Sequence, residues 1–318
     1  MIYKTDGQAV NSCWSVFSVT ENSLNLKYKI MQNIVGIDIG GSHITLAQVD
    51  PEKREIISST YVREHVNSFD GKEVIFSAWV SAIEKAAHDL EKKNLLIGIA
   101  MPGPFDYESG ISLMQQGKFI DIYQVNIKEE LANRLAVSQD QIHFVNDAAA
   151  FMEGEVFGGC AQHFKSVFGV TLGTGLGTTF FNGEFATDED LWDSPFKESI
   201  AEDYLATRWF VSRYKELTGE EISGTKDLLD KPKAVQMQIF NEYADSFSEF
   251  ITKYVDHYKP EALVIGGNIA KAYPYFEPRF IQNLTKNNIN LQVKISAIFE
   301  DAAILGAASY ALKKAFIN

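Results

Sequence analysis

The sequence predicts an α/β fold of two domains that face one another across a cleft. Patterns typical of strands alternate with patterns typical of helices through most of the 318 residues. Each half of the chain begins with a strand, a glycine turn and a second strand, at residues 34–50 and 166–185. The length allows two domains that each bury a hydrophobic core.

The first half is predicted to open on a hairpin, because β-forming apolar residues flank two adjacent glycines. The later strands are nearly continuous apolar runs, as buried strands are, and the helices have apolar residues at helical spacing. The expected elements are the hairpin over 34–50, a helix over 72–93, a strand over 95–100, a helix over 127–137, a strand over 142–146 and a helix after Asp147.

The second half repeats this arrangement with longer helices. Its hairpin carries glycines at alternate positions, and its last helix is rich in alanine. The expected elements are the hairpin over 166–185, helices over 200–217 and 234–257, a strand and a Gly-Gly turn over 262–270, a strand over 291–299 and a helix over 301–316.

The composition is that of a soluble globular protein, with 46% hydrophobic and 22% charged residues. No apolar run reaches the roughly 18 residues that indicate a membrane span. The formal net charge of −13 disfavours a nucleic-acid partner. Cys13 and Cys160 lack metal-ligand spacing and form no disulfide framework. Residues 1–30 show no periodicity and no secretory signal, so we expect a cytoplasmic protein with an N-terminal extension, or a native start at Met31.

The first glycine turn joins Asp38 to Gly40, Gly41 and Ser42. Adjacent glycines adopt positive φ without cost, so the N–H groups of the turn can point together toward an anion such as phosphate. A carboxylate beside phosphate is tolerable when a cation lies between them, which suggests phosphate and Mg²⁺ chemistry. A purely structural hairpin is the alternative that this stretch alone leaves open.

Two further glycine turns occur, at LGTGLG (172–177) and IGGN (265–268). Neither is a Walker A loop, because no Gly-Lys-Ser or Gly-Lys-Thr is present. LGTGLG does not fit a dinucleotide fingerprint either, because a strand pattern follows it where a helix is required.

In this order and spacing, the motifs resemble those of the ROK family of sugar kinases, which share the actin-like, ribonuclease H-like ATPase fold. The resemblance runs from about Met31 to the C-terminus. It implies a small domain over 31–147, completed by the helix at 301–318, and a large domain over 148–300. The motifs that carry it are IDIGGS (37–42), GIAMPGPFD (98–106), NDAAAFMEGE (146–155), GVTLGTGLG (169–177), LVIGGNI (263–269) and DAAILGAA (301–308).

The resemblance implies ATP and Mg²⁺ as cofactors, with Asp147 as the catalytic base and Asp38 positioning Mg²⁺ through water. A carboxylate fixed at a strand end can hold a sugar hydroxyl in line and accept its proton late. Capping the next helix is the alternative role for Asp147. The other implied site residues are Gly40, Gly41 and Ser42 in the first phosphate motif; Thr171, Gly173, Thr174 and Gly175 in the second; Gly266, Gly267 and Asn268 for adenosine; and Gly103 and Asn146 for the sugar.

The chain departs from the family pattern between residues 188 and 205. The family's Glu-x-Gly-His motif and its three zinc-binding cysteines are missing, so we expect no zinc site. Glu202 aligns with the glutamate that contacts sugar in the family. Asp190 is a candidate replacement for the glutamate of the missing motif, with Trp192 or Asp193 beside it. The alternative is that these aspartates belong to a solvated acidic loop.

The expected function is that of an ATP-dependent hexose kinase acting on glucose or an N-acetylhexosamine. Two alternatives are a catalytically weak sugar or nucleotide sensor and a sugar-responsive transcriptional regulator. The regulator is disfavoured because only 30 featureless residues precede Met31 and the chain is acidic. The resemblance also implies a homodimer, and shielding of the sugar hydroxyl from water implies closure of the two domains.

Overall fold

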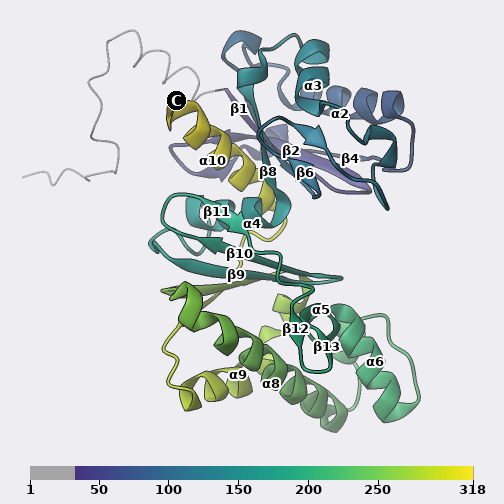
Figure 1. Cartoon of the computed structure of the whole chain (residues 1–318), viewed down its shortest axis with the longest axis vertical. Coiled ribbons are helices and arrows are strands. Elements are labelled where there is room, and N and C mark those ends of the chain that lie inside the picture. The colour runs from purple at the N-terminus through teal and green to yellow at the C-terminus, as the bar shows by residue number, and fades with distance from the viewer. Residues whose placement is uncertain (1–32, 318) are drawn as a thin grey trace, which may run out of the picture.

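The computed structural model describes residues 33–317, which form two lobes, each built on a mixed β-sheet (Figure 1). The predicted extension over residues 1–30 lies outside the described residues. Within the described part, no helix is long and apolar enough to cross a membrane.

The first sheet has the strand order β3-β2-β1-β5-β8, with β4 also paired to β2. Strands β1 and β2 form the predicted antiparallel hairpin, whereas β1, β5 and β8 run parallel to one another. The carboxyl ends of these three strands therefore meet at one edge of the sheet. The bounds are β1 (Ile34–Ile39), β2 (His43–Asp50), β3 (Glu55–Ile56), β4 (Val62–His65), β5 (Leu96–Met101) and β8 (Ile142–Asn146).

Two helices, α2 (Lys72–Ala86) and α3 (Ile127–Leu135), belong to the first lobe, as does a short hairpin of β6 (Phe105–Asp106) and β7 (Ile111–Ser112). The core of this lobe is aromatic at its centre, where Trp79 of α2 packs edge-on against Phe76 and Phe119. All three side chains are fully buried.

The second sheet has the order β11-β10-β9-β14-β15. One of its faces is covered by a layer of helices packed through a large cluster of phenylalanines and tyrosines. The strands are β9 (Val167–Leu172), β10 (Leu176–Phe181), β11 (Ala186–Asp188), β14 (Ala262–Gly266) and β15 (Gln292–Ile295), with a separate pair β12 (Pro195–Phe196) and β13 (Ser199–Ile200). The helices are α5 (Ala201–Leu205), α6 (Thr207–Thr218), α7 (Thr225–Leu228), α8 (Lys233–Tyr258) and α9 (Tyr273–Lys286).

Helices α4 (Asp147–Phe157) and α10 (Asp301–Ile317) lie between the two sheets (Figure 1). α10 packs against β1, β5 and β8 of the first sheet, and α4 packs against α10 and against β10 and β11 of the second. The helices touch at backbone distance, because a Cβ atom on Gly306 would lie 1.7 Å from the carbonyl oxygen of Ala150. This close contact joins the lobes.

Several predicted elements differ from the bounds that their sequence pattern suggests. The helix predicted over 72–93 stops at Ala86, whose carbonyl oxygen accepts a hydrogen bond from the amide of Gln48 at 2.9 Å. The helix predicted over 200–217 is broken at Ala206, which has extended backbone angles. The strand predicted over 291–299 ends at Ile295, because the chain there leaves the second sheet and crosses to α10.

Candidate active site

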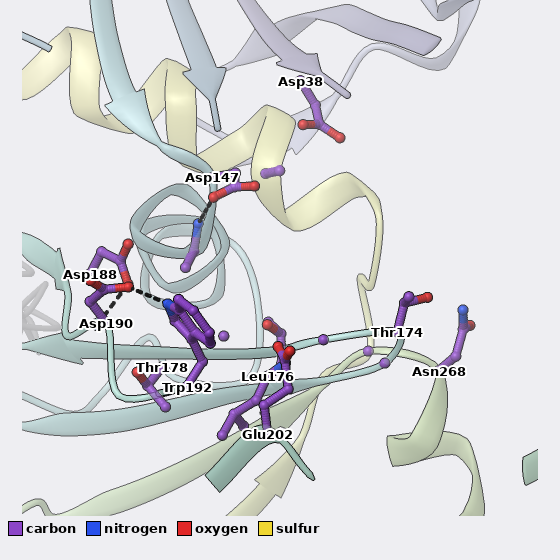
Figure 2. A pocket seen from close by; sticks show the side chains of 17 residues that line it. Asp38, Asp147, Thr174, Leu176, Thr178, Asp188, Asp190, Trp192, Glu202 and Asn268 are labelled. Carbon is purple, nitrogen blue, oxygen red and sulfur yellow. Dashed lines mark hydrogen bonds between the residues drawn. The ribbon is translucent and has the colours of Figure 1, made fainter. Parts of the chain in front are cut away.

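A cleft of about 700 Å³ lies between the lobes and collects side chains from both sheets (Figure 2). Most of the residues predicted for the site line it. They are Asp38, Asp147, Thr171, Gly173, Thr174, Gly175, Asp190, Glu202, Gly267 and Asn268. Gly40, Gly41, Ser42, Gly103, Asn146 and Gly266 are not part of this lining, although several of them border residues that are.

Asp38 is the next-to-last residue of β1, near the edge where the parallel strands present their carboxyl ends to the cleft. Its side chain is mostly enclosed, and burial together with the negative charges of Asp147 and Glu300 raises its pKa to about 7. The positive charge of Arg63 opposes this rise. Asp38 thus lies in a pocket with an excess of negative charge, a setting that favours a cation.

The first glycine turn, residues 40–42, links β1 to β2 beside Asp38. The N–H of Gly40 donates to the carbonyl oxygen of His43 at 2.9 Å, which closes the turn. The hydroxyl of Ser42 lies 2.9 Å from Nδ1 of the His43 ring. His43 is a strand histidine, paired with His65 of β4 and in edge contact with its ring.

Asp147 follows β8 directly and opens α4. The helix cap is made by its neighbour Asn146, whose side-chain oxygen accepts hydrogen bonds from the N–H groups of Ala148 and Ala149 at 2.7 and 3.1 Å. Asn146 also donates to the hydroxyl of Tyr107 at 3.2 Å. Because Asn146 supplies the cap, the Asp147 side chain remains open to the cleft.

The carboxylate of Asp147 accepts a hydrogen bond from the Ala148 N–H at 2.9 Å. The surrounding walls of the cleft remove enough water to raise its pKa, while that hydrogen bond and the charge of Lys118 act in the opposite direction. A carboxylate with a raised pKa that still reaches solvent is suited to accepting a proton.

The second glycine turn connects β9 to β10 and is supported from below. The carbonyl oxygen of Gly173 accepts hydrogen bonds from both the N–H and the hydroxyl of Thr207, each at 2.8 Å. The break at Ala206 therefore has a role: it frees Thr207 to bind the turn. Thr174 at the tip is exposed to the cleft.

The third glycine turn follows β14. Gly267 has φ of +82°, and a Cβ atom there would lie 2.4 Å from the carbonyl oxygen of Leu172, so only glycine fits. Asn268 is exposed on the cleft side, and its side-chain oxygen accepts a hydrogen bond from Lys271 at 2.9 Å. Gly266 is buried against the ring of Phe151 and supports the turn from behind.

The segment in which the sequence departs from the family pattern, residues 188–205, contributes to the opposite end of the cleft. One oxygen of Asp190 accepts a hydrogen bond from the indole N–H of Trp192 at 2.7 Å (Figure 2). One oxygen of Glu202 accepts from the N–H of Leu176 at 2.9 Å, and the other binds Arg208 at 2.5 Å. Both predicted sugar-binding carboxylates are thus engaged with protein groups.

Asp188 is a cleft residue that the sequence analysis did not single out. It ends β11 and lines the cleft, and burial and the charges of Asp190 and Asp147 raise its pKa. Within the described residues, its carboxylate accepts one hydrogen bond, from the N–H of Asp190 at 3.1 Å. In the sequence, Asp188 opens the acidic stretch DED (188–190), and no local pattern distinguishes it from the other acidic residues there.

Gly103 is exposed on the loop after β5. A Cβ atom added to it would lie 3.4 Å from the hydroxyl oxygen of Tyr107. Tyr107 in turn donates to the carbonyl oxygen of Met101 at 3.1 Å and accepts from Asn146. Gly103 therefore borders the cleft through this hydrogen-bonded group and does not line it.

Two lobes with mixed sheets and a cleft between them make up a two-domain α/β fold that is also found in solved structures of ROK proteins. One such structure is the ROK family glucokinase of Streptomyces griseus in complex with glucose and AMPPNP. It matches with a TM-score of 0.67 at 20% identity, covering 87% of this chain and 98% of that one.

Sequence comparison agrees with the fold. The model of the ROK family matches residues 34–188. The chain is 24% identical to the glucokinase of Thermotoga maritima, over 87% of this chain and 96% of the relative. It is 25% identical to the N-acetyl-D-glucosamine kinase of Mannheimia succiniciproducens, over 88% of this chain and 100% of the relative. The chain belongs to the ROK family.

Proposed function

We propose that this protein is an ATP-dependent hexose kinase that transfers the γ-phosphoryl group to a sugar hydroxyl, with glucose or an N-acetylhexosamine as acceptor. The single observation that supports this most is the position of Asp147. Its carboxylate is open to the cleft at the carboxyl end of β8, opposite the second and third glycine turns. The curated relatives in both sugar classes support the choice of acceptors.

The nucleotide would lie along the turns of the second lobe. Thr174 and Gly175 present backbone and hydroxyl groups to the phosphates, and Gly267 and Asn268 approach the adenosine. The carboxylate oxygens of Asp38 and the negative charges around it suit a Mg²⁺ ion held through water. When bound, the ion would supply positive charge to the phosphates. The chain itself positions these groups through the supports described above.

The reacting hydroxyl would be held by Asp147. As its oxygen forms a bond to the γ-phosphorus, the bond from that phosphorus to the bridging oxygen breaks, and the electron pair leaves with ADP. The hydroxyl proton passes to the Asp147 carboxylate late in the reaction. Positioning contributes most of the rate, because the transition state is loose.

The sugar would bind between Asp147 and the β11 segment. Asp188 offers an oxygen to a sugar hydroxyl, and the partly exposed ring of Trp192 offers an apolar face for a pyranose. Asp190 holds that ring in place, and Glu202 fixes the second glycine turn. Homodimer formation and a cytoplasmic location stay predictions from the resemblance.

The test is an ADP-release assay with Mg-ATP over a panel of hexoses and N-acetylhexosamines. We expect turnover of at least about 1 s⁻¹ on one of these sugars. Absence of turnover on every sugar would contradict the proposal. In that case, binding of an ATP analogue and of a sugar, measured by calorimetry, would favour the sensor alternative.

A further inference from the structure

The cleft carries many carboxylates and few available cations. Five acidic side chains line it: Asp38, Asp147, Asp188, Asp190 and Glu202. The guanidinium groups nearest to them are already paired, Arg208 with Glu202 and Arg63 with Glu300 at 2.7 Å. A transferred phosphoryl group spreads negative charge over three oxygens, so a site built this way requires additional positive charge on the protein side.

Lys118 provides a cation beside the first glycine turn of the first lobe. It precedes Phe119, which is fully buried and packs against Trp79 in the core. The N–H of Phe119 donates to the carbonyl oxygen of Ser68 at 2.9 Å. The backbone at Lys118 is therefore anchored beside the first glycine turn, while its side chain is exposed.

The side chain of Lys118 crosses the glycine turn directly over Gly41. A Cβ atom added to Gly41 would lie 2.4 Å from Cδ and 2.6 Å from Cε of the lysine. The stem of Lys118 thus occupies the space that glycine leaves free, which gives the second glycine of the turn a function beyond backbone flexibility.

The ammonium group of Lys118 acts on the Asp147 side of the cleft. Its charge favours the ionised form of the Asp147 carboxylate and so lowers the pKa of that group. Among the residues that the structure describes, Lys118 makes no ion pair or hydrogen bond through its ammonium. It is therefore available to a ligand placed between the first glycine turn and Asp147.

We propose that Lys118 is a further catalytic residue of the phosphoryl transfer, whose ammonium binds the oxygens of the transferred group as it moves to the hydroxyl on Asp147. This inference rests on the proposed kinase function. Lys118 stays protonated throughout: the hydroxyl proton goes to Asp147, and the electron pair of the broken bond leaves with ADP. The lysine contributes charge at the phosphoryl group, where negative charge must be stabilised.

The experiment compares Lys118→Met, Lys118→Arg and the control Lys128→Met in the full-length protein with Mg-ATP and the best sugar of the panel. Methionine keeps the stem over Gly41 and removes only the charge. Lys128, in the first turn of α3, is a lysine of the same lobe whose ammonium already donates to the carbonyl oxygen of Glu108 at 3.3 Å and which lines a different cavity. Thermal unfolding verifies that each variant is folded.

We expect Lys118→Met to lower kcat by about 100-fold or more. We also expect its Kd values for the sugar and for AMPPNP to stay within about threefold of wild type. Lys118→Arg should recover at least about tenfold of that loss, because its charge reaches the same place, and Lys128→Met should match wild type.

A kcat of Lys118→Met within about threefold of wild type would overturn the assignment, as would a loss confined to the KM for sugar. Either result, obtained with an active wild-type enzyme, would exclude the catalytic role of Lys118 and leave the proposed kinase function in place. Absence of wild-type turnover on every sugar would remove the kinase function and this inference together.

Discussion

The carboxylate of Asp38 faces that of Asp147 across the first-lobe edge of the cleft, and the charge of Asp147 raises the pKa of Asp38 (Figure 2). The two residues come from β1 and from the end of β8, which are separated by β5 in the parallel part of the sheet. Their closeness concentrates negative charge where the proposed Mg²⁺ and phosphoryl group would bind.

This arrangement predicts a pH-dependent cost to stability. The pKa of Asp38 is about 7 in the folded protein and near 3.8 in the unfolded chain. The folded state therefore holds the proton more tightly, and stability is lost as pH rises from about 4 to about 7. In metal-free buffer, Asp38→Asn should raise the Tm at pH 8 by about 3 to 8 °C and leave it nearly unchanged at pH 4.

Calorimetry or far-UV circular dichroism of both proteins between pH 4 and pH 8 tests this. A Tm difference that is the same at all pH values would contradict the raised pKa of Asp38.

Asp147→Asn should lower kcat by about 1,000-fold, because the amide cannot accept the hydroxyl proton. The fold should persist, because the side chain of Asn146 accepts hydrogen bonds from Ala148 and Ala149 at the start of α4, and an asparagine at 147 can still accept the one from Ala148. Steady-state kinetics and thermal unfolding measure the two effects. Asp256→Asn, a change at an exposed position of α8, is the matched control. A loss of less than roughly tenfold would remove Asp147 as the base.

Asp188 should matter more for sugar binding than Asp190. An asparagine at 190 can still accept the indole hydrogen bond of Trp192, whereas an asparagine at 188 loses the charge that faces the cleft. We expect Asp188→Asn to raise the KM for sugar by about tenfold or more, and Asp190→Asn by less than about threefold. The two variants serve as controls for each other. If sugar titrations gave Asp190→Asn the larger increase in KM, the sugar contact would be assigned to Asp190 instead.

The buried ion pair between Glu153 of α4 and Lys313 of α10 should be important for stability. Glu153 is fully buried, and burial raises its pKa while Lys313, 2.6 Å away, opposes the rise. Lys313→Met leaves the carboxylate without that partner and should cost about 3 to 5 kcal/mol at pH 8. The cost should shrink as pH falls through the raised pKa, because a protonated Glu153 needs no cation.

Urea unfolding at pH 8 and pH 5 measures this free energy. Glu153→Gln combined with Lys313→Met should recover part of the loss, because it removes the unpaired charge as well. A double variant as unstable as Lys313→Met alone would show that packing, and not charge, is responsible.

Several elements could be predicted from the sequence because their signals are local. The strand over 142–146 was predicted with its observed bounds, and the last helix was predicted as 301–316 and observed as Asp301–Ile317. The glycine turns were also found, because glycine is the residue that most clearly marks a turn in a sequence. The positive φ expected for the first turn was wrong, since Gly267 of the third turn has a positive φ and Gly40 and Gly41 do not. Helix ends at Ala86 and Ala206 were missed because distant groups, Gln48 and Gly173, determine them.

The candidate site could be predicted in part. Asp38, Asp147, the glycines of the second turn and Gly267 of the third lie together in the cleft. Asp188 was missed because its place depends on the pairing of β11 with β10, in which Asp188 faces Thr179. Lys118 was missed because its proposed role depends on its position over Gly41, which is far from it in the sequence.

By itself, the sequence determined the α/β class, the three turns and the carboxylate that follows β8, because periodicity, glycine and strand ends are properties of neighbouring residues. Only the tertiary structure decided that Asn146 caps α4, that Asp190 and Glu202 are bound to protein groups, that Asp188 lines the cleft, and that Lys118 lies over Gly41. The physical reason is that parallel strand order and the close contact of α4 with α10 bring together groups that are far apart in the chain, and hydrogen bonds then select which of them remain free for a ligand.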